Sequence, residues 1–168
     1  MKAWDRDAGR SPSVCQSLGA RAEAILNQRD TYFDVPHGRL KLRETEGMTA
    51  QLIAYERPNE ATHRTSNYRI VEVDDAASMR LSLEATLGVS AVVAKTRRLY
   101  IWRGVRIHLD DVSELGSFIE FEAIAPPQSD LSDEETRVRT LRQAFGIVES
   151  DIVGGSYADL LVSLRQHG

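Results

Sequence analysis

The chain has 168 residues, of which 27% are charged, and 21 Lys and Arg against 25 Asp and Glu give a net charge of −4. This length predicts one domain over residues 1–168, and the negative charge argues against a general nucleic-acid binder. The single cysteine, Cys15, excludes a disulfide within the chain and a cysteine-based zinc cluster. No stretch approaches the roughly 20 apolar residues that span a bilayer, so we expect a cytoplasmic protein.

Turn signals divide the first half of the chain into a short helix and a series of strands. Ser11-Pro12 is typical of a helix start, and Gly19 ends that helix. The composition predicts strands at about 22–33, 39–43, 49–56 and 68–73, with a polar loop over 57–67. Asp74 is expected to cap a helix that runs to Leu87 and ends at Gly88.

The second half continues the pattern of strands and ends in two helices. We predict strands at about 89–102, 105–109 and 117–124, separated by turns at Arg103-Gly104 and at 110–116. Ser132 and Glu135 form a capping-box pattern for a helix that ends near Phe145, and a last helix is expected over about 157–164. These elements predict an α+β domain rich in antiparallel hairpins.

Charged residues recur at every second position of several predicted strands. Arg39, Lys41 and Arg43 share one strand face, and Leu40 and Leu42 share the other. The same spacing groups Lys95 with Arg97, Arg106 with His108 and Asp110, and Glu120 with Glu122. A two-layer protein with solvated outer strand faces would also show such alternation. Here, however, one strand is purely basic and another purely acidic, and like charges are unfavourable as cross-strand neighbours.

Two predicted helices carry apolar stripes, Met79-Leu83-Leu87 and Val138-Leu141-Phe145, which must cover apolar sheet faces. Leu40, Leu42 and Phe121 lie on such faces, so the charged faces are expected to point the other way. If the strands curl round, those faces line a polar cavity whose Arg and Lys need counter-charge. A polyphosphate supplies that charge, because its oxygens match the forked donors of Arg, and carboxylates nearby would hold a divalent cation.

The order of several short motifs resembles the CYTH superfamily, the triphosphate tunnel metalloenzymes. The motifs are Asp30-Thr31-Tyr32-Phe33, Gly38 to Arg43, Tyr55 to Pro58, Val105 to Asp110, Leu115-Gly116 and Glu120-Phe121-Glu122. The stretch from Ser156 to Leu161 is most similar to the branch usually labelled class IV adenylyl cyclase. The resemblance covers about residues 20–161. It implies a closed or nearly closed eight-stranded antiparallel β-barrel, a tunnel, with flanking helices.

The resemblance also implies the residues of the site and its metal, Mg²⁺ or Mn²⁺. By position, the phosphate ligands would be Lys2, Arg39, Lys41, Arg43, Arg57, Lys95, Arg97 and Arg106. Glu120 and Glu122 would bind the metal with Asp110 in support, and Lys95, Glu120 and Glu122 would be the catalytic residues. The family has a Glu-x-Glu-x-Lys motif on its first strand. Lys2 falls at its final position, and both glutamates would precede Met1, so either the start is assigned too late or the first strand is truncated.

Three functions are compatible with this pattern. The leading hypothesis is a divalent-metal-dependent phosphohydrolase acting on a nucleoside, thiamine or inorganic triphosphate. A class IV adenylyl cyclase, which converts ATP to cyclic AMP and pyrophosphate, would need the same basic cradle. A non-catalytic triphosphate-binding protein is the third. Single-stranded nucleic-acid binding would need aromatic platforms, for which Tyr100 and Trp102 are the candidates near the basic strands. We therefore expect a triphosphate-containing small molecule as the partner, and neither nucleic acid nor a membrane.

Overall fold

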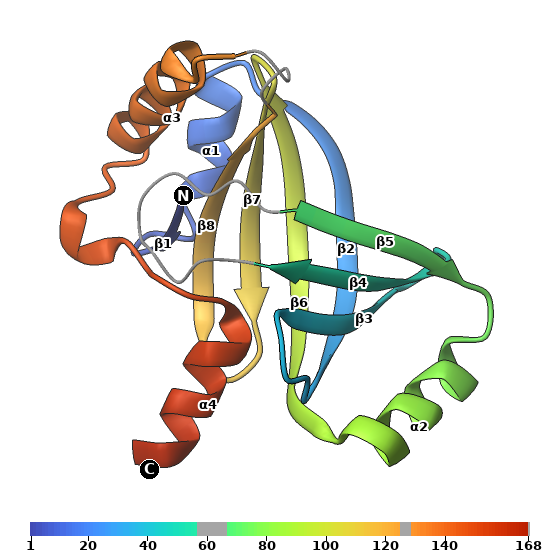
Figure 1. The fold of residues 1–168 in the computed structure, drawn as a ribbon. Coiled ribbons are helices and arrows are strands. Elements are labelled where there is room, and N and C mark those ends of the chain that lie inside the picture. The colour runs from blue at the N-terminus through green and yellow to red at the C-terminus, as the bar shows by residue number, and fades with distance from the viewer. Residues whose placement is uncertain (57–66, 125–128, 168) are drawn as a thin grey trace. The chain divides into compact units, whose positions relative to one another are not determined.

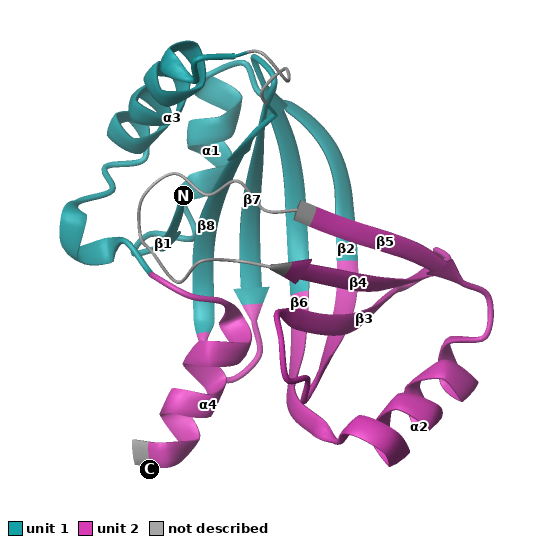
Figure 2. Ribbon diagram, viewed as in Figure 1, with its two compact units in different colours: residues 1–26, 96–111, 116–153 teal, residues 27–95, 112–115, 154–168 magenta. Residues whose placement is uncertain are grey.

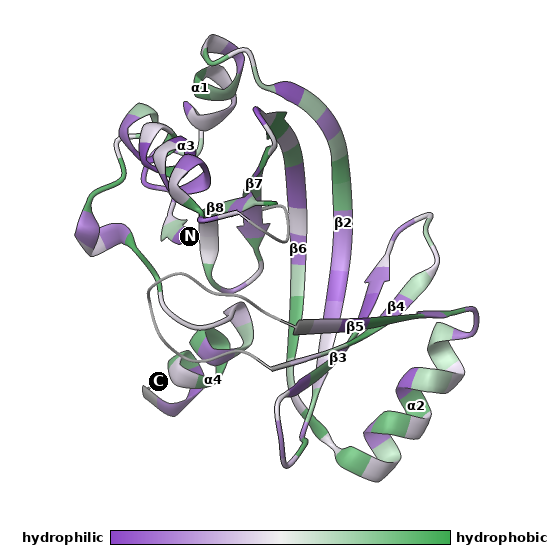
Figure 3. Cartoon of the chain, turned by 45° about the horizontal axis from the view of Figure 1, so that its top comes forward, coloured by the Kyte–Doolittle hydropathy of each residue, from purple (hydrophilic) through white to green (hydrophobic). Residues whose placement is uncertain are grey.

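The computed structural model describes residues 1–56, 67–124 and 129–167, which form an eight-stranded antiparallel sheet and four α-helices (Figure 1). The sheet order is β1-β8-β7-β6-β2-β3-β4-β5. The strands are β1 (Lys2–Trp4), β2 (Arg21–Phe33), β3 (Arg39–Thr45), β4 (Ala50–Glu56), β5 (Asn67–Val73), β6 (Val89–Trp102), β7 (Val105–Val112) and β8 (Gly116–Ala123). A hydrophilic run over residues 95–98 lies between more hydrophobic ends of β6 (Figure 3).

The expected closed barrel is not confirmed. Within the described residues, β1 and β5 are the two ends of the sheet order, and no hydrogen-bonded pairing joins them. One predicted boundary also matters for function. The turn expected at 110–116 is wrong at its start, because β7 continues to Val112 and Asp110 is therefore a strand residue with a defined face.

The helices are α1 (Ser11–Ser17), α2 (Ala76–Leu87), α3 (Ser132–Ala144) and α4 (Tyr157–His167), with a 3-10 turn over Glu149–Asp151. All four lie where the sequence predicts them, but three predicted caps are wrong. At α1 the N-cap is Arg10, not Ser11. Asp75, not Asp74, accepts the hydrogen bond from the Ser78 N–H at the start of α2. At α3 the N-cap position belongs to Leu131, which has a left-handed backbone with φ 66°, and the Ser132 hydroxyl donates to Asp130.

No helix in the described part of the chain is both long enough and apolar enough to cross a membrane.

The chain divides into two compact units, each assembled from separate segments (Figure 2). Unit 1 comprises residues 1–26, 96–111 and 116–153, and unit 2 comprises residues 27–95, 112–115 and 154–168. The long strands β2 and β6 contribute residues to both units. The expectation of a single domain stays a prediction.

Each unit has its own apolar core, and both predicted helix stripes are confirmed. In unit 1, Val138 and Leu141 of α3 and Phe145 at its C-cap pack on the core that contains Phe121, and the Phe121 and Phe145 ring centroids lie 5.5 Å apart. In unit 2, Met79, Leu83 and Leu87 of α2 cover the core that contains Leu42. Because side chains alternate along a strand, burial of Leu42 against α2 turns Lys41 and Arg43 to the opposite face of β3.

Candidate functional site

The basic face of β3 in unit 2 meets a single carboxylate on the neighbouring strand. Arg43 of β3 lies directly opposite Asp30 of β2 in the antiparallel register, and Lys41 lies opposite Tyr32. Lys41 is therefore the diagonal neighbour of Asp30, within reach of a long side chain. The other neighbour of β2 in the sheet is β6, which carries Lys95. Cations thus approach Asp30 from the strands on both of its sides.

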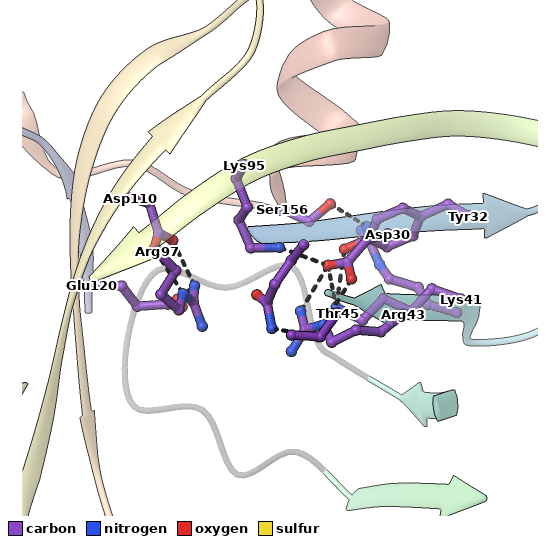
Figure 4. A network of polar contacts seen from close by, with 12 residues as sticks. Asp30, Tyr32, Lys41, Arg43, Thr45, Lys95, Arg97, Asp110, Glu120 and Ser156 are labelled. Carbon is purple, nitrogen blue, oxygen red and sulfur yellow. Dashed lines mark hydrogen bonds and ion pairs between the residues drawn. The ribbon is translucent and has the colours of Figure 1, made fainter. Parts of the chain in front are cut away.

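Asp30 is the centre of this cluster, because three cations share its two oxygens (Figure 4). The Arg43 guanidinium donates through Nε to Oδ1 and through Nη2 to Oδ2, at 2.7 Å each. Lys41 Nζ donates to Oδ2 at 3.1 Å, and Lys95 Nζ donates to the same oxygen at 3.0 Å. The side chain of Asp30 is only 2% exposed. We call Asp30, Lys41, Arg43 and Lys95 the Asp30 cluster.

The four side chains of the Asp30 cluster comprise one acidic and three basic groups. Burial alone raises the pKa of the Asp30 carboxyl, but Lys41, the Arg43 hydrogen bond and Lys95 outweigh it and hold that pKa well below its usual value. Burial lowers the pKa of Lys41 to about 7; Asp30 opposes this shift, and the neighbouring Arg43 and Lys95 reinforce it. Within these four side chains, one carboxylate therefore faces three basic groups, an arrangement that favours contact with negative charge.

Arg39, the third basic residue on this face of β3, is tied to the start of α4 within the same unit. Its Nη1 donates to the Ser156 hydroxyl and to Asp159 Oδ1, both at 2.8 Å. Ser156 and Asp159 also cap α4 reciprocally: the Ser156 N–H donates to Asp159, and the Asp159 N–H donates to the Ser156 hydroxyl. Arg39 is thus paired outside the Asp30 cluster.

Unit 1 holds the opposite arrangement, in which one guanidinium is shared by two carboxylates (Figure 4). Arg97 of β6 donates to both oxygens of Asp110 on β7, at 2.7 and 2.6 Å, and its Nη2 also donates to Glu120 Oε2 on β8 at 3.0 Å. His108 Nδ1 lies 3.5 Å from the same Glu120 oxygen. Lys2 of β1 lies directly opposite Glu120 in the register. We call Arg97, Asp110 and Glu120 the Arg97 cluster.

The surroundings of Glu120 keep it ionised. Burial alone raises the pKa of its carboxyl, but the His108 hydrogen bond, Arg97 and Lys2 lower it well below the usual value. Glu122, two residues further along β8, is in a different environment. Its Oε2 lies 3.3 Å from Arg106 Nη1, and the two side chains are 47% and 45% exposed. The Glu120 carboxylate is therefore fixed by hydrogen bonds, and the Glu122 carboxylate is largely solvated.

The carboxylates of unit 1 fit a divalent metal only in part. Across the described residues, no group of three or more His, Cys, Asp and Glu side chains is arranged to hold a metal ion. Both oxygens of Asp110 accept hydrogen bonds from Arg97, so we leave Asp110 out of the proposed ligand set. Mg²⁺ commonly binds through one or two carboxylates together with waters and substrate phosphates, and Glu120 and Glu122, on one face of β8, fit that mode.

The structure brings together some of the sequence-predicted site residues and separates others. Lys41, Arg43 and Lys95 converge on Asp30, while Arg97 and Lys2 accompany Glu120 in unit 1. Arg106 pairs with Glu122 in a partly exposed position, and Arg57 lies outside the described residues. Sequence reasoning missed Asp30 as the shared partner. The alternation of side chains along β2 could have identified it, because Asp30 and Tyr32 share the face of β2 that corresponds to the basic face of β3.

Comparison with known proteins agrees with the fold. The family model for the CYTH domain matches residues 6–157. The PH1012 protein of Pyrococcus horikoshii is similar in structure, with a TM-score of 0.82, 21% identity, and coverage of 95% of this chain and 98% of that one. A "putative adenylate cyclase" from Vibrio parahaemolyticus has a TM-score of 0.78 and 21% identity, and the match covers 96% of this chain and 95% of that one. Another from Bacillus halodurans has a TM-score of 0.62 and 16% identity, with coverage of 95% and 94%.

No curated protein matches the sequence. The family model covers most of the chain, so this protein belongs to the CYTH family. Proteins of this family bind triphosphate substrates and are in general metal-dependent enzymes. The similar solved structures are at most 21% identical, so they establish the fold alone.

Proposed function

We propose that this protein is a divalent-metal-dependent phosphohydrolase that acts on a triphosphate. The observation that carries the proposal is the convergence of three cations in the Asp30 cluster, in which one buried carboxylate faces Lys41, Arg43 and Lys95. Several cations held together at low exposure repel one another, and a polyphosphate relieves that repulsion. The membership of the chain in the CYTH family supports the same ligand class.

In this proposal the cations of unit 2 bind and orient the phosphates. The guanidinium of Arg43 offers a planar set of donors that suits two phosphate oxygens, and the ammonium groups of Lys41 and Lys95 act as point charges. Asp30 holds all three in place before the ligand arrives, which reduces the entropy lost on binding. Lys95 is the proposed catalytic cation, because its buried ammonium can offset charge that develops on a phosphate oxygen.

In unit 1, Glu120 and Glu122 are the proposed ligands of Mg²⁺ or Mn²⁺, and Arg97 and His108 hold Glu120 in position. When bound, the metal would offset the charge of the phosphate oxygens. Arg97 keeps Glu120 deprotonated and oriented, and Lys2 opposite Glu120 adds positive charge. Lys2, Arg39, Arg97 and Arg106 stay proposed phosphate ligands, and Arg39, Arg97 and Arg106 each also contact a carboxylate.

The test is product analysis with ATP and with inorganic triphosphate, each with Mg²⁺, Mn²⁺ or a chelator. We expect metal-dependent release of orthophosphate, and its loss in Glu122→Gln, which keeps the shape of the side chain and removes its charge. The matched control is Glu114→Gln, because Glu114 pairs with Arg165 at the same 3.3 Å and with similar exposure. Binding of both triphosphates without any turnover would contradict hydrolysis and favour a binding protein.

Adenylyl cyclase chemistry is the second candidate, and two observations favour it. Two similar solved structures carry the name "putative adenylate cyclase", and Ser156 and Asp159 of the class IV-like motif contact Arg39. The same assay separates the two reactions. Hydrolysis releases orthophosphate from both substrates, whereas cyclisation yields cyclic AMP and pyrophosphate from ATP and nothing from inorganic triphosphate.

A further inference from the structure

The basic face of unit 2 continues sideways into a row of aromatic and apolar side chains. Across β3, β4 and β5, the register places Arg39 opposite Tyr55 and Tyr55 opposite Tyr68. The next row in the same register is Lys41, Ile53 and Ile70. Residues directly opposite in an antiparallel sheet share a face. Tyr68 and Ile70 on β5 therefore lie on the same face as the basic residues of β3.

The two strands of this row differ in exposure. On β4, Tyr55 and Ile53 are 7% and 4% exposed, whereas on the terminal strand β5, Tyr68 and Ile70 are 53% and 55% exposed. The rings of Tyr55 and Tyr68 are 5.4 Å apart with an interplanar angle of 36°, so the buried ring supports the exposed one. Edge strands usually carry charged residues that discourage contacts. Two large exposed side chains at these alternate positions depart from that rule.

The buried part of the row touches the Asp30 cluster. Lys41 Nζ lies 5.3 Å from the centre of the Tyr32 ring and 5.9 Å from that of Tyr55, within the range of cation–π contacts. Strands in a sheet are about 4.8 Å apart, so β5 lies roughly 10 Å from β3. A ligand with its phosphates at Lys41 and Arg43 could therefore extend across β4 and place a flat group on Tyr68.

We propose that Tyr68 and Ile70 form a platform for the aromatic ring of the substrate, an inference that rests on the triphosphate function proposed above. The preferred substrate is then a triphosphate ester of a flat aromatic group, such as a nucleoside triphosphate, and inorganic triphosphate is the poorer ligand. Stacking on a tyrosine ring tolerates any base, because every base has a π-face. The platform therefore selects for the presence of a ring more than for its identity.

The test is calorimetric titration of the full chain with ATP and with inorganic triphosphate, in a chelator to prevent turnover. Tyr68→Ala is expected to weaken ATP binding by about 5- to 150-fold, the range of aromatic–base stacking, and to leave inorganic triphosphate unaffected. Tyr68→Phe should retain ATP affinity, and Ile70→Ala should show a smaller loss for ATP alone. The control is Leu81→Ala on α2, which removes an exposed apolar side chain of similar exposure outside this row.

The outcomes separate this inference from the proposed function. If wild type binds neither ATP nor inorganic triphosphate, the proposed function fails and takes the inference with it. If wild type binds both but Tyr68→Ala changes the two affinities equally or not at all, only the platform is overturned. The platform is also overturned if Tyr68→Ala changes the sedimentation coefficient of the protein without changing its ATP affinity. That result would make Tyr68 part of an interface between two copies of the chain.

Discussion

The two polar clusters of this molecule have opposite compositions. In unit 2, one carboxylate, Asp30, serves three cations, whereas in unit 1 one guanidinium, Arg97, serves two carboxylates. Both centres are buried, so neither is fully solvated. The first cluster, when protonated, favours an additional anion, whereas in the second the positive charge of Lys2 adds to that of Arg97 beside Glu120. The comparison teaches that the ratio of acidic to basic groups around a buried ion indicates the class of ligand better than the total number of charged groups does.

Asp30→Asn should produce the largest effect, because it removes the shared counter-charge and leaves three cations together. Removing one partner from a buried ion pair typically costs about 3–5 kcal/mol of unfolding free energy, and we expect a loss in that range. Inorganic triphosphate should then raise the melting temperature of the variant by more than that of wild type. Denaturant unfolding and thermal melts measure the two effects. Asp151→Asn is the control, since Asp151 pairs with one largely exposed arginine, Arg6. An equal loss in both variants would contradict the central role of Asp30.

Arg97→Gln tests the Arg97 cluster of unit 1. It should lower the unfolding free energy somewhat less than Asp30→Asn does, by about 3 kcal/mol, because the Glu120 side chain is 24% exposed and can be hydrated. The variant frees carboxylate oxygens of Asp110 and Glu120, so added Mn²⁺ should stabilise it more than it stabilises wild type. Thermal melts with and without Mn²⁺ give the measurement. Arg142→Gln, which removes one partly exposed partner of Glu149, is the control. If Mn²⁺ stabilises neither the variant nor wild type, the carboxylates of unit 1 are a structural network only.

Much of the site could be predicted from the sequence, because strand periodicity fixes the face of each side chain. Leu40 and Leu42 alternate with Lys41 and Arg43, and this pattern alone places the cations away from α2. The apolar stripes of α2 and α3 fix which sheet faces those helices cover. These predictions needed no knowledge of which strands are neighbours.

The rest depended on strand order and register, which alternation does not encode. Asp30 meets Lys95 because β6 and β2 are neighbours, although 65 residues separate them in sequence. Asp110 was expected in a turn, because Asp110-Asp111 and Gly116 are turn-favouring residues, whereas β7 continues through it and aims it at Arg97. Pairing energy across the sheet overrode local propensity there. The α2 cap is Asp75 and not Asp74, because local sequence does not distinguish two adjacent residues with the same side chain.

The pH dependence of binding tests whether the positive excess of unit 2 depends on Lys41. The pKa of Lys41 is about 7 in the folded protein, so its ammonium loses its proton as pH rises through that value. A bound triphosphate favours the charged form, so affinity should fall above pH 7 by up to about tenfold per pH unit. Unfolding takes up a proton between the folded pKa and the unfolded value near 10.4. The contribution of Lys41 to the unfolding free energy should therefore rise with pH across that window.

Lys41→Arg is the matched variant for that titration, because arginine stays charged across the range. The ligand's own titration affects wild type and variant alike, so the difference between their affinity–pH curves isolates Lys41. Calorimetric titrations from pH 6 to 9 measure it. Parallel curves for the two proteins would show that another group governs the pH dependence.

The smallest effect is expected at the rim of unit 1, where Arg106 pairs with Glu122. Both side chains are nearly half exposed, and such surface ion pairs contribute about 0–1 kcal/mol, so Arg106→Ala should barely change the unfolding free energy. Arg165→Ala breaks the comparable Glu114 pair of unit 2 and is the control. Because Arg106 is a proposed phosphate ligand and Arg165 is not, their triphosphate affinities should differ even though their stabilities match. Equal affinities would remove Arg106 from the ligand set and confine phosphate binding to the buried cations, where charge is screened least by salt.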